Sequence, residues 1–123
     1  MECLKPLQES GSLWSRYKAE MHGLTVIEQS YGFCAFTEAQ DSIFIDEFYV
    51  VPEHRQTGFG KTLLNQVKTA ARIAGKRHIT STVSLGSKTA SLSLLAQLHV
   101  GFQVVRAENN SLLLKLYVGD ANG

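Results

Sequence analysis

The stretch between Ile43 and Gly75 constrains the fold more than any other part of the chain. Residues 43–51 (IFIDEFYVV) are almost continuously apolar, which is typical of a central strand that is covered on both faces. Residues 58–74 follow after a short connection and repeat apolar side chains at helical spacing, and Gly75 is placed to end that helix. The stretch therefore predicts a strand that leads into a long helix.

Elements on both sides of this unit complete a mixed α/β pattern. We predict further helices at about 7–21 and 87–100, and further strands at 25–29, 33–39, 78–85, 102–108 and 112–118. The first two strands are expected to form an antiparallel hairpin, and Asn109-Asn110 to form the last turn. The order predicts one sheet with helices on its faces.

Each helix has a predicted face or cap. In the first helix Leu13, Tyr17 and Met21 recur at helical spacing, and Ser10 or Ser12 is expected to cap its start. In the helix at 58–74 the residues expected to face inward are Leu63, Leu64, Val67, Ala70, Ala71 and Ala74. In the helix at 87–100 they are Leu92, Leu95, Ala96 and His99 or Val100.

The composition fits one domain and gives no indication of a nucleic-acid, membrane or metal partner. The chain has 123 residues, 44% of them hydrophobic, and its 12 Lys and Arg nearly balance its 11 Asp and Glu. This balance gives no electrostatic reason to expect nucleic acid or a membrane surface as a partner.

No apolar run approaches a membrane span or a signal core, so a cytoplasmic location is expected. Cys3 and Cys34 lack metal or redox spacing and the histidines are scattered, so no metal site is expected.

The connection Arg55-Gln56-Thr57-Gly58-Phe59-Gly60-Lys61 carries the most chemical information. A helix that begins at the carboxyl end of a strand presents free N–H groups and the positive end of its dipole to an anion. Gly58 and Gly60 remove side chains where the backbone must approach the anion, and Arg55 adds a positive charge. These residues predict a phosphate cradle from Arg55 to Lys61. A plain strand–turn–helix with glycines for tight packing is the alternative interpretation.

Two common phosphate motifs do not fit the same stretch. The dinucleotide fingerprint needs a third glycine, and a P-loop needs a glycine where this chain has Arg55, although Gly60-Lys61-Thr62 matches its end. The stretch instead resembles the Arg/Gln-x-x-Gly-x-Gly/Ala motif of the GNAT family of N-acetyltransferases. The resemblance extends back through Phe48–His54, forward to a helix that ends in Gly101-Phe102, and over about residues 23–118. Residues 45–60 are also similar to polyamine acetyltransferases.

The resemblance implies a single acetyltransferase domain over residues 1–123 with a shortened N-terminal region. It implies a mostly antiparallel sheet in which strands 43–51 and 78–85 part in a V-shaped splay. It also implies acetyl-coenzyme A (acetyl-CoA) as cofactor, with its pyrophosphate on main-chain amides, its pantetheine arm along strand 43–51 and the Val50 N–H near the thioester oxygen. The implied cofactor-binding residues are Phe48, Tyr49, Val50, Arg55, Gln56, Thr57, Gly58, Phe59, Gly60 and Lys61.

Asp46 and Glu47 are the implied catalytic residues. Strand alternation is expected to place them on opposite faces, with Asp46 on the face of Phe44 and Phe48. Asp46 matches the position of the general base in polyamine-type relatives, and burial would raise its pKa. The alternative for either residue is a purely structural role, as a carboxylate that is hydrogen-bonded to a neighbouring strand or helix.

The chain departs from the family pattern at the proton donor. Gln97 stands where many relatives have a tyrosine that protonates the leaving thiolate, and Tyr49, Tyr117 and His99 are possible replacements. The asparagine that relatives place at the start of this helix is also absent, and Ser87 or Thr89 is a possible substitute.

The sequence therefore predicts transfer of the acetyl group of acetyl-CoA to a primary amine by direct attack in a ternary complex. A small amine and a protein amine both remain open as the acceptor. The alternative is a non-catalytic module of the same fold that binds coenzyme A. The short N-terminal region predicts an open acceptor site, or one completed by a second subunit in a homodimer.

Overall fold

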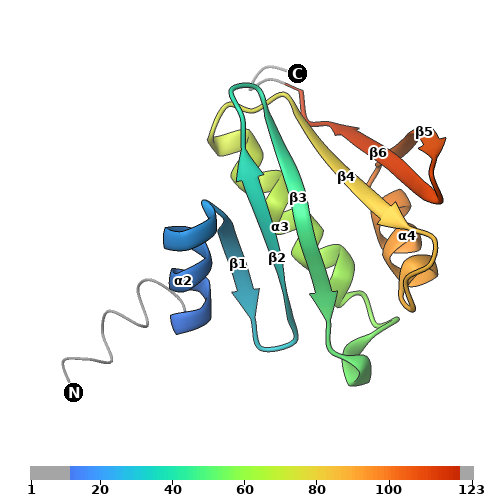
Figure 1. The fold of residues 1–123 in the computed structure, drawn as a ribbon, viewed down its shortest axis with the longest axis horizontal. Helices are drawn as coiled ribbons and strands as arrows, with labels where there is room; N and C mark the ends of the chain where they lie inside the picture. Colours follow the sequence, from blue (N-terminus) through green and yellow to red (C-terminus); the bar gives the residue numbers. More distant parts are fainter. Residues whose placement is uncertain (1–11, 120–123) are drawn as a thin grey trace.

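The computed structural model describes residues 12–119 as a six-stranded sheet with helices on both faces (Figure 1). The elements are α2 (Leu13–His22), β1 (Thr25–Gln29), β2 (Gly32–Glu38), β3 (Ser42–Val50), the 3-10 turn η1 (Pro52–His54), α3 (Phe59–Ile73), β4 (His78–Ser84), α4 (Ala90–His99), β5 (Gln103–Glu108) and β6 (Ser111–Tyr117).

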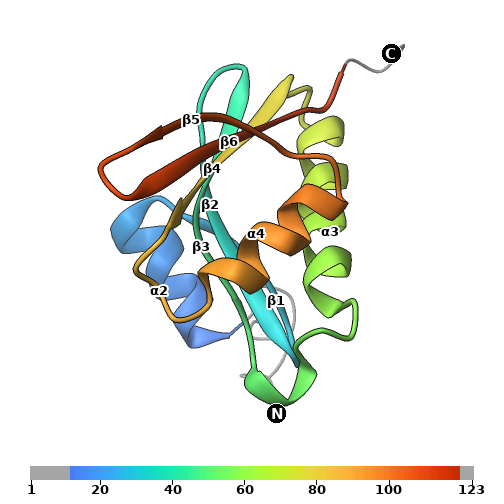
Figure 2. The same ribbon diagram turned by 90° about the vertical axis from the view of Figure 1, so that its right-hand side faces the viewer.

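The strands lie in the order β1-β2-β3-β4-β6-β5, and every neighbouring pair is antiparallel except β3 and β4. Figure 2 shows α2 on one side of the sheet and α3 and α4 on the other. The predicted mixed α/β architecture, the first hairpin and the turn at Asn109-Asn110, where both residues have positive φ, are confirmed. Within residues 12–119, no helix combines the length and apolar character that a membrane span requires.

The core lies between the sheet and α3. Leu63, Leu64 and Val67 of α3 are buried against Phe36 and Ile43 of the sheet. The predicted inward face of this helix is confirmed except at its end, where Ala74 is exposed because the helix stops at Ile73.

Strands β3 and β4 separate halfway along their length. They pair only from Ser42 with His78 to Ile45 with Ser81. Beyond that point β4 continues to pair with β6, while β3 runs on to Val50 without a partner on its β4 side. The predicted splay is confirmed, and it exposes one edge of β3 in the middle of the sheet.

A bulge in β3 begins where the splay begins. Ala35 pairs with Glu47 and Phe36 with Ile45, so Asp46 is an extra residue without a partner in β2. A bulge interrupts the alternation of side chains between the two faces. Glu47 consequently forms an ion pair with Lys18 of α2, and Asp46 is close enough to both to feel their charges. The expectation that the two acids lie on opposite faces is wrong.

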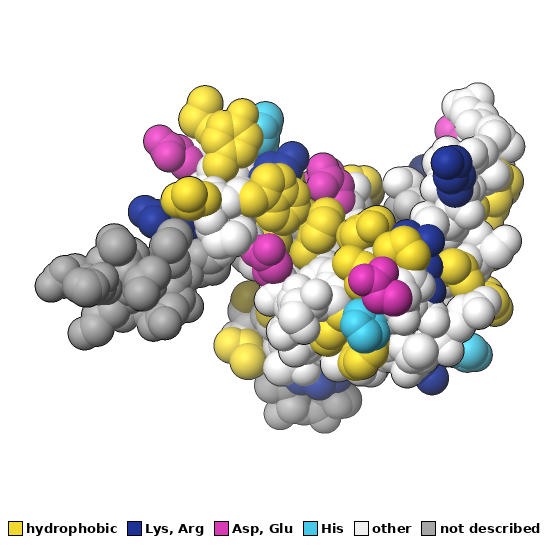
Figure 3. All heavy atoms as spheres, turned by 90° about the horizontal axis from the view of Figure 1, so that it is seen from below, with side chains coloured by type: hydrophobic (Ala, Val, Ile, Leu, Met, Phe, Trp, Pro, Cys, Tyr) yellow, Lys and Arg dark blue, Asp and Glu magenta, His cyan; other side chains and the backbone are white. Residues whose placement is uncertain are grey.

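Helix α2 begins at the predicted cap Ser12, whose side chain accepts a hydrogen bond from the Ser15 N–H. Residues 7–11 of the predicted helix, including Ser10, lie outside the described residues. The apolar stripe that indicated the helix, formed by Leu13, Tyr17 and Met21, is exposed to solvent. Hydrophobic side chains accordingly gather over α2 at the upper left of Figure 3.

Helix α4 packs against the core with a face that overlaps the predicted one only in part. Gln97 is its buried residue, with Leu94 and Val100 packed against the core as well, whereas Leu95 and His99 are exposed. The predicted inward face is confirmed at Ala96 and Val100, which pack against the core, and is wrong at Leu95 and His99. The glutamine that takes the buried position interrupts the apolar pattern on the side that packs.

Candidate functional site

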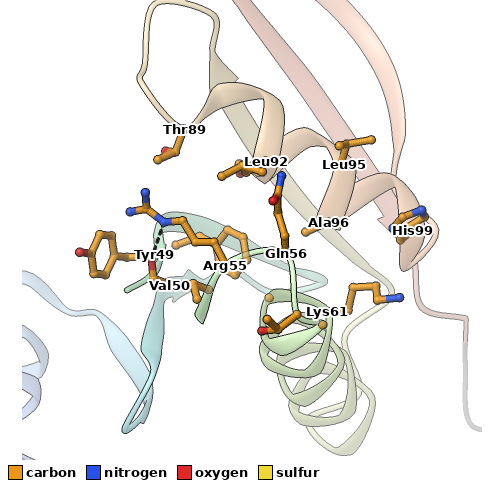
Figure 4. A pocket seen from close by; sticks show the side chains of 15 residues that line it. Tyr49, Val50, Arg55, Gln56, Lys61, Thr89, Leu92, Leu95, Ala96 and His99 are labelled. Carbon is orange, nitrogen blue, oxygen red and sulfur yellow. Dashed lines mark hydrogen bonds between the residues drawn. The ribbon is translucent and has the colours of Figure 1, made fainter. Parts of the chain in front are cut away.

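A cavity of about 530 Å³ lies between the end of β3, the turn after it, the start of α3 and one face of α4 (Figure 4). Nine of the ten residues expected to bind a cofactor line it: Phe48, Tyr49, Val50, Arg55, Gln56, Thr57, Gly58, Gly60 and Lys61. The exception is the side chain of Phe59, which stacks on Tyr31 with ring centres 4.3 Å apart. We call this space the turn cavity.

The far wall of the turn cavity includes much of the face of α4 that is predicted to point inward. The wall consists of Thr89, Leu92, Ser93, Leu95, Ala96 and His99. Three of these six residues, Leu92, Leu95 and Ala96, carry the apolar pattern of the helix in the sequence. An apolar helical face that meets a cavity rather than a core has the same sequence pattern, so the sequence alone could not distinguish the two.

Six consecutive main-chain amides, from Gln56 to Lys61, have no hydrogen-bond acceptor within the described part of the chain. The Thr62 N–H, which donates to the Gly58 carbonyl, is the first that has one. Gln56 and Gly58 have φ values of 62° and 93°. Left-handed residues in such a turn direct successive N–H groups toward a common concavity that suits an anion.

Gly60 allows three elements to meet at this cavity. A Cβ atom at this position would lie 3.4 Å from the Phe48 ring, 3.5 Å from the Ala96 side chain and 3.8 Å from the Val50 side chain. The start of α3 therefore packs closely against both β3 and α4. This contact holds the free amides in front of the end of β3.

Arg55 ties the turn to the strand. Its Nε–H donates to the Val50 carbonyl at 2.8 Å, and its guanidinium carbon lies 5.5 Å from the centre of the Tyr49 ring. Figure 4 shows Arg55 and Gln56 reaching from the turn toward α4. A guanidinium has five N–H donors, so this arrangement leaves four of them for a ligand.

The main chain of β3 faces the splay at two residues. The Val51 N–H donates to the Tyr31 carbonyl, so Val51 directs its main-chain polar groups toward β2. In an antiparallel pair, alternate residues direct their N–H and C=O groups away from the partner strand. Phe48 and Val50, which lie opposite Cys34 and Gly32, are the residues that direct these groups away from β2. Their polar groups therefore point into the gap that β4 has left.

A second cavity, of about 520 Å³, lies on the other side of the splay, and we call it the acid cavity. Asp46 and Glu47 line it together with residues of β4 and with Gln97. Phe48, Tyr49, Thr89 and Ser93 line both cavities. The two spaces thus meet at the splay, and the predicted acids lie next to the predicted cofactor residues.

The two acids have different electrostatic surroundings. Although Asp46 is exposed at the rim, partial desolvation raises its pKa above the usual value, and the charge of Glu47 raises it further. A hydrogen bond with Thr37 and the charge of Lys18 act in the opposite direction. Glu47 is paired with Lys18 at 3.4 Å. Asp46 is therefore the acid whose surroundings favour uptake of a proton.

The predicted replacements for the proton donor are distributed unevenly. Tyr49 and His99 line the turn cavity, but Tyr117 lies beside His78 at the opposite end of β4 from the splay, so its assignment to the site is wrong. Thr89 lines both cavities and Ser87 lines the acid cavity. Sequence reasoning missed Ser93, which lines both.

Gln97 is buried in the wall of the acid cavity. Its Nε2 donates to the Ser93 Oγ at 3.0 Å, one helical turn earlier. Its Oε1 is buried and has no partner among the described residues. No group of three or more His, Cys, Asp or Glu side chains within residues 12–119 is arranged to hold a metal ion.

Structural comparison finds several acetyltransferases with the same fold. PaiA N-acetyltransferase from Thermoplasma acidophilum, solved in complex with coenzyme A, matches with a TM-score of 0.63 and 18% identity over 71% of this chain and 53% of its own. YncA from Salmonella typhimurium, a putative acetyltransferase solved with its cofactor acetyl-CoA, matches with a TM-score of 0.63 and 18% identity over 83% and 69%. This chain thus spans about half the length of the Thermoplasma protein.

A putative GNAT acetyltransferase from Desulfovibrio desulfuricans matches more completely, over 94% of this chain and 90% of its own, with a TM-score of 0.68 and 17% identity. At these identities the structures show a shared fold. No curated protein matches the sequence significantly. The sequence itself matches the acetyltransferase (GNAT) domain over residues 17–104, and the chain therefore belongs to the GNAT acetyltransferase family.

Proposed function

We propose that this chain binds acetyl-CoA and transfers its acetyl group to a primary amine. The observation that carries the proposal is the run of free amides from Gln56 to Lys61 at the end of a splayed strand. The cofactors bound to PaiA and YncA support the choice of ligand. When bound, acetyl-CoA supplies an activated acetyl thioester.

The turn cavity has the groups that a long pyrophosphate-containing ligand needs. The free amides and Arg55 would hold the pyrophosphate. The main-chain groups of Phe48 would pair with amides of the pantetheine arm, as an added strand does. Arg55 already occupies the Val50 carbonyl, which leaves the Val50 N–H to stabilise negative charge that develops on the carbonyl oxygen.

The acid cavity has the groups that an amine needs. Asp46 and Glu47 attract a cationic amine, and the raised pKa of Asp46 suits it to accept the proton that the amine must lose before it attacks. Glu47, which is neutralised in part by Lys18, would orient the amine. The non-catalytic alternative is favoured by Gln97, because its amide supplies no acid at that position.

The test is thiol release from acetyl-CoA in the presence of a panel of small amines and lysine-containing peptides, with thermal shift as a measure of binding. Wild type should be stabilised by acetyl-CoA and release thiol with at least one amine. Asp46→Asn should retain the thermal shift and lose roughly two to four orders of magnitude in turnover. Asp41→Asn, a matched change in the exposed β2–β3 turn, should retain both.

Stabilisation without thiol release across the panel would support the non-catalytic alternative. The absence of any thermal shift would refute the cofactor site. Unchanged turnover in Asp46→Asn would remove this residue from the mechanism.

A further inference from the structure

We propose that the Ser93 hydroxyl, with its oxygen held by the Gln97 amide, donates a hydrogen bond to the cofactor sulfur as the carbon–sulfur bond breaks. This inference rests on the proposed function. It assigns Ser93 a catalytic role and Gln97 a positioning role, in place of the missing acid.

The position of Ser93 follows from the two cavities. If the cofactor lies in the turn cavity and the amine in the acid cavity, the reacting thioester lies where they meet. The four residues that line both cavities surround that point, and three of them have hydroxyl groups: Tyr49, Thr89 and Ser93.

Ser93 is the hydroxyl whose orientation the structure defines best. Figure 4 shows the Tyr49 hydroxyl pointing away from the cavity, beyond the Arg55 guanidinium. The Thr89 Oγ1 lies 3.3 Å from the Ser87 Oγ, and either hydroxyl can donate in that contact. Among the three, Ser93 is the one that accepts a hydrogen bond from a buried side chain, which limits where its own O–H can point.

The hydroxyl of Ser93 is oriented by its neighbour. Gln97 is 1% exposed and cannot easily change its side-chain conformation, and its Nε2–H donates to the Ser93 Oγ. This contact occupies an acceptor site on the oxygen and directs the O–H elsewhere. Within residues 12–119 the Ser93 hydroxyl has no acceptor of its own, so it is available to a ligand in the cavity.

The fold gives the oxygen of Gln97 no partner among the described residues. A buried acceptor without a donor is costly, and native structures rarely keep one without a reason. An amide whose only role was to fill the core could be replaced by an apolar side chain of similar size. The Gln97 amide, at the wall of the acid cavity, is therefore better explained by its contact with Ser93 than by packing alone.

Transfer of the acetyl group forms one bond to the acetyl carbon and breaks another. The lone pair of the amine nitrogen forms a bond to the acetyl carbon, the carbon–sulfur bond breaks, and its electron pair stays on sulfur as a thiolate. The amine proton leaves to Asp46 or to water. Ser93 keeps its own proton, because an alcohol is a far weaker acid than a thiol with a pKa of about 8.5. The thiolate takes its final proton from solvent.

The experiment measures the pKa of the coenzyme A thiol when it is bound, from the ultraviolet absorbance of the thiolate, together with kcat and the cofactor Kd. In wild type the pKa of the bound thiol should be lower than in solution, because Ser93 stabilises the thiolate. Ser93→Ala should move this pKa back toward the solution value and reduce kcat roughly ten- to a hundredfold, as expected for a hydrogen bond to a charged group. The Kd of coenzyme A at neutral pH should change little.

Three further variants keep the test independent of folding. Ser93→Thr retains a hydroxyl and should restore much of the effect. Gln97→Met keeps the volume but releases Ser93, so it should give a smaller change in the same direction. Ser91→Ala is a matched control, since Ser91 is exposed on the same helix and lines neither cavity.

The inference is overturned if the pKa of the bound thiol is the same in wild type, Ser93→Ala and solution, or if Ser93→Ala retains full kcat. In that case wild type would still release thiol and the proposed function would stand. If wild type does not bind coenzyme A at all, both the proposed function and this inference fail.

Discussion

Gly58 offers a direct test of the proposed phosphate cradle. It has a φ of 93°, and a Cβ atom added to it would have no other atom within 4 Å. Both Asn and Asp therefore fit at this position. Both would bear the same backbone strain, about 1–2 kcal/mol for a left-handed residue, and Asn and Asp tolerate this conformation better than most side chains. The two variants are nearly identical in shape and differ in charge.

The difference in cofactor affinity follows from Coulomb's law. At a separation of about 5 Å from one phosphate charge, the carboxylate introduced by Gly58→Asp would be repelled by about 3 kcal/mol at an effective dielectric constant of 20, and by about 1 kcal/mol in bulk water. The site is open to solvent and salt, so a value of about 1–2 kcal/mol is expected, which corresponds to a roughly five- to thirtyfold loss of affinity relative to Gly58→Asn.

Calorimetric titration of coenzyme A into wild type, Gly58→Asn and Gly58→Asp measures this difference. Thermal unfolding without ligand should show similar losses of stability in the two variants. The gap in affinity between them should shrink at high salt, because screening weakens the repulsion. Equal affinities in the two variants, or a gap that salt does not change, would refute a phosphate position at the free amides.

Three other predictions concern single side chains. Asp46→Asn should raise the Tm or leave it unchanged at neutral pH. The pKa of Asp46 is higher in the folded state, so wild type loses stability as the pH rises from the unfolded-state pKa through the folded-state pKa. A Tm advantage of the variant that grew toward low pH would contradict this. Burial raises the pKa of Cys34 to about 12, so in a Cys3→Ser background a thiol reagent at neutral pH should modify Cys34 only at the rate of unfolding; rapid labelling of the folded protein would disprove this. Leu63→Ala should cost about 2–5 kcal/mol in urea unfolding, against about 0.5 kcal/mol or less for the control Ile73→Ala, and similar losses in both would contradict the assignment of the core.

The features that the sequence predicts well depend on short-range physics. Gly58 and Gly75 have positive φ at the two ends of α3, where the sequence places them, and Ser12 caps α2. Positive φ, helix capping and the free amides of a helix start are decided by a few consecutive residues, so they can be inferred without knowledge of the tertiary structure.

The features that the sequence misses depend on what each element meets. Leu92 and Leu95 repeat at helical spacing as core residues do, but they face a cavity, and the polar Gln97 takes the buried position. The exposed stripe on α2 is a similar case, since Leu13 and Met21 indicate a helix without indicating a partner for that face. Periodicity shows that a helix has an apolar side, but it does not show what covers that side.

The bulge at Asp46 was missed for another reason, and it links the two halves of the site. No glycine or proline marks the bulge, so the sequence predicts an uninterrupted alternation of side chains through it. A bulge bends a strand and increases its twist, and the last pair between β3 and β4, Ile45 with Ser81, lies directly before Asp46. The same residue therefore coincides with the start of the splay and brings the two acids together at the acid cavity. The bulge also determines that the side chains of Phe48 and Val50 lie on the face that packs against Gly60, because a shift of one residue would turn both to the other face. Removal of the extra residue would thus disturb the acid cavity, the free strand edge and the start of α3 at once, which argues that the site is built into the packing of this sheet.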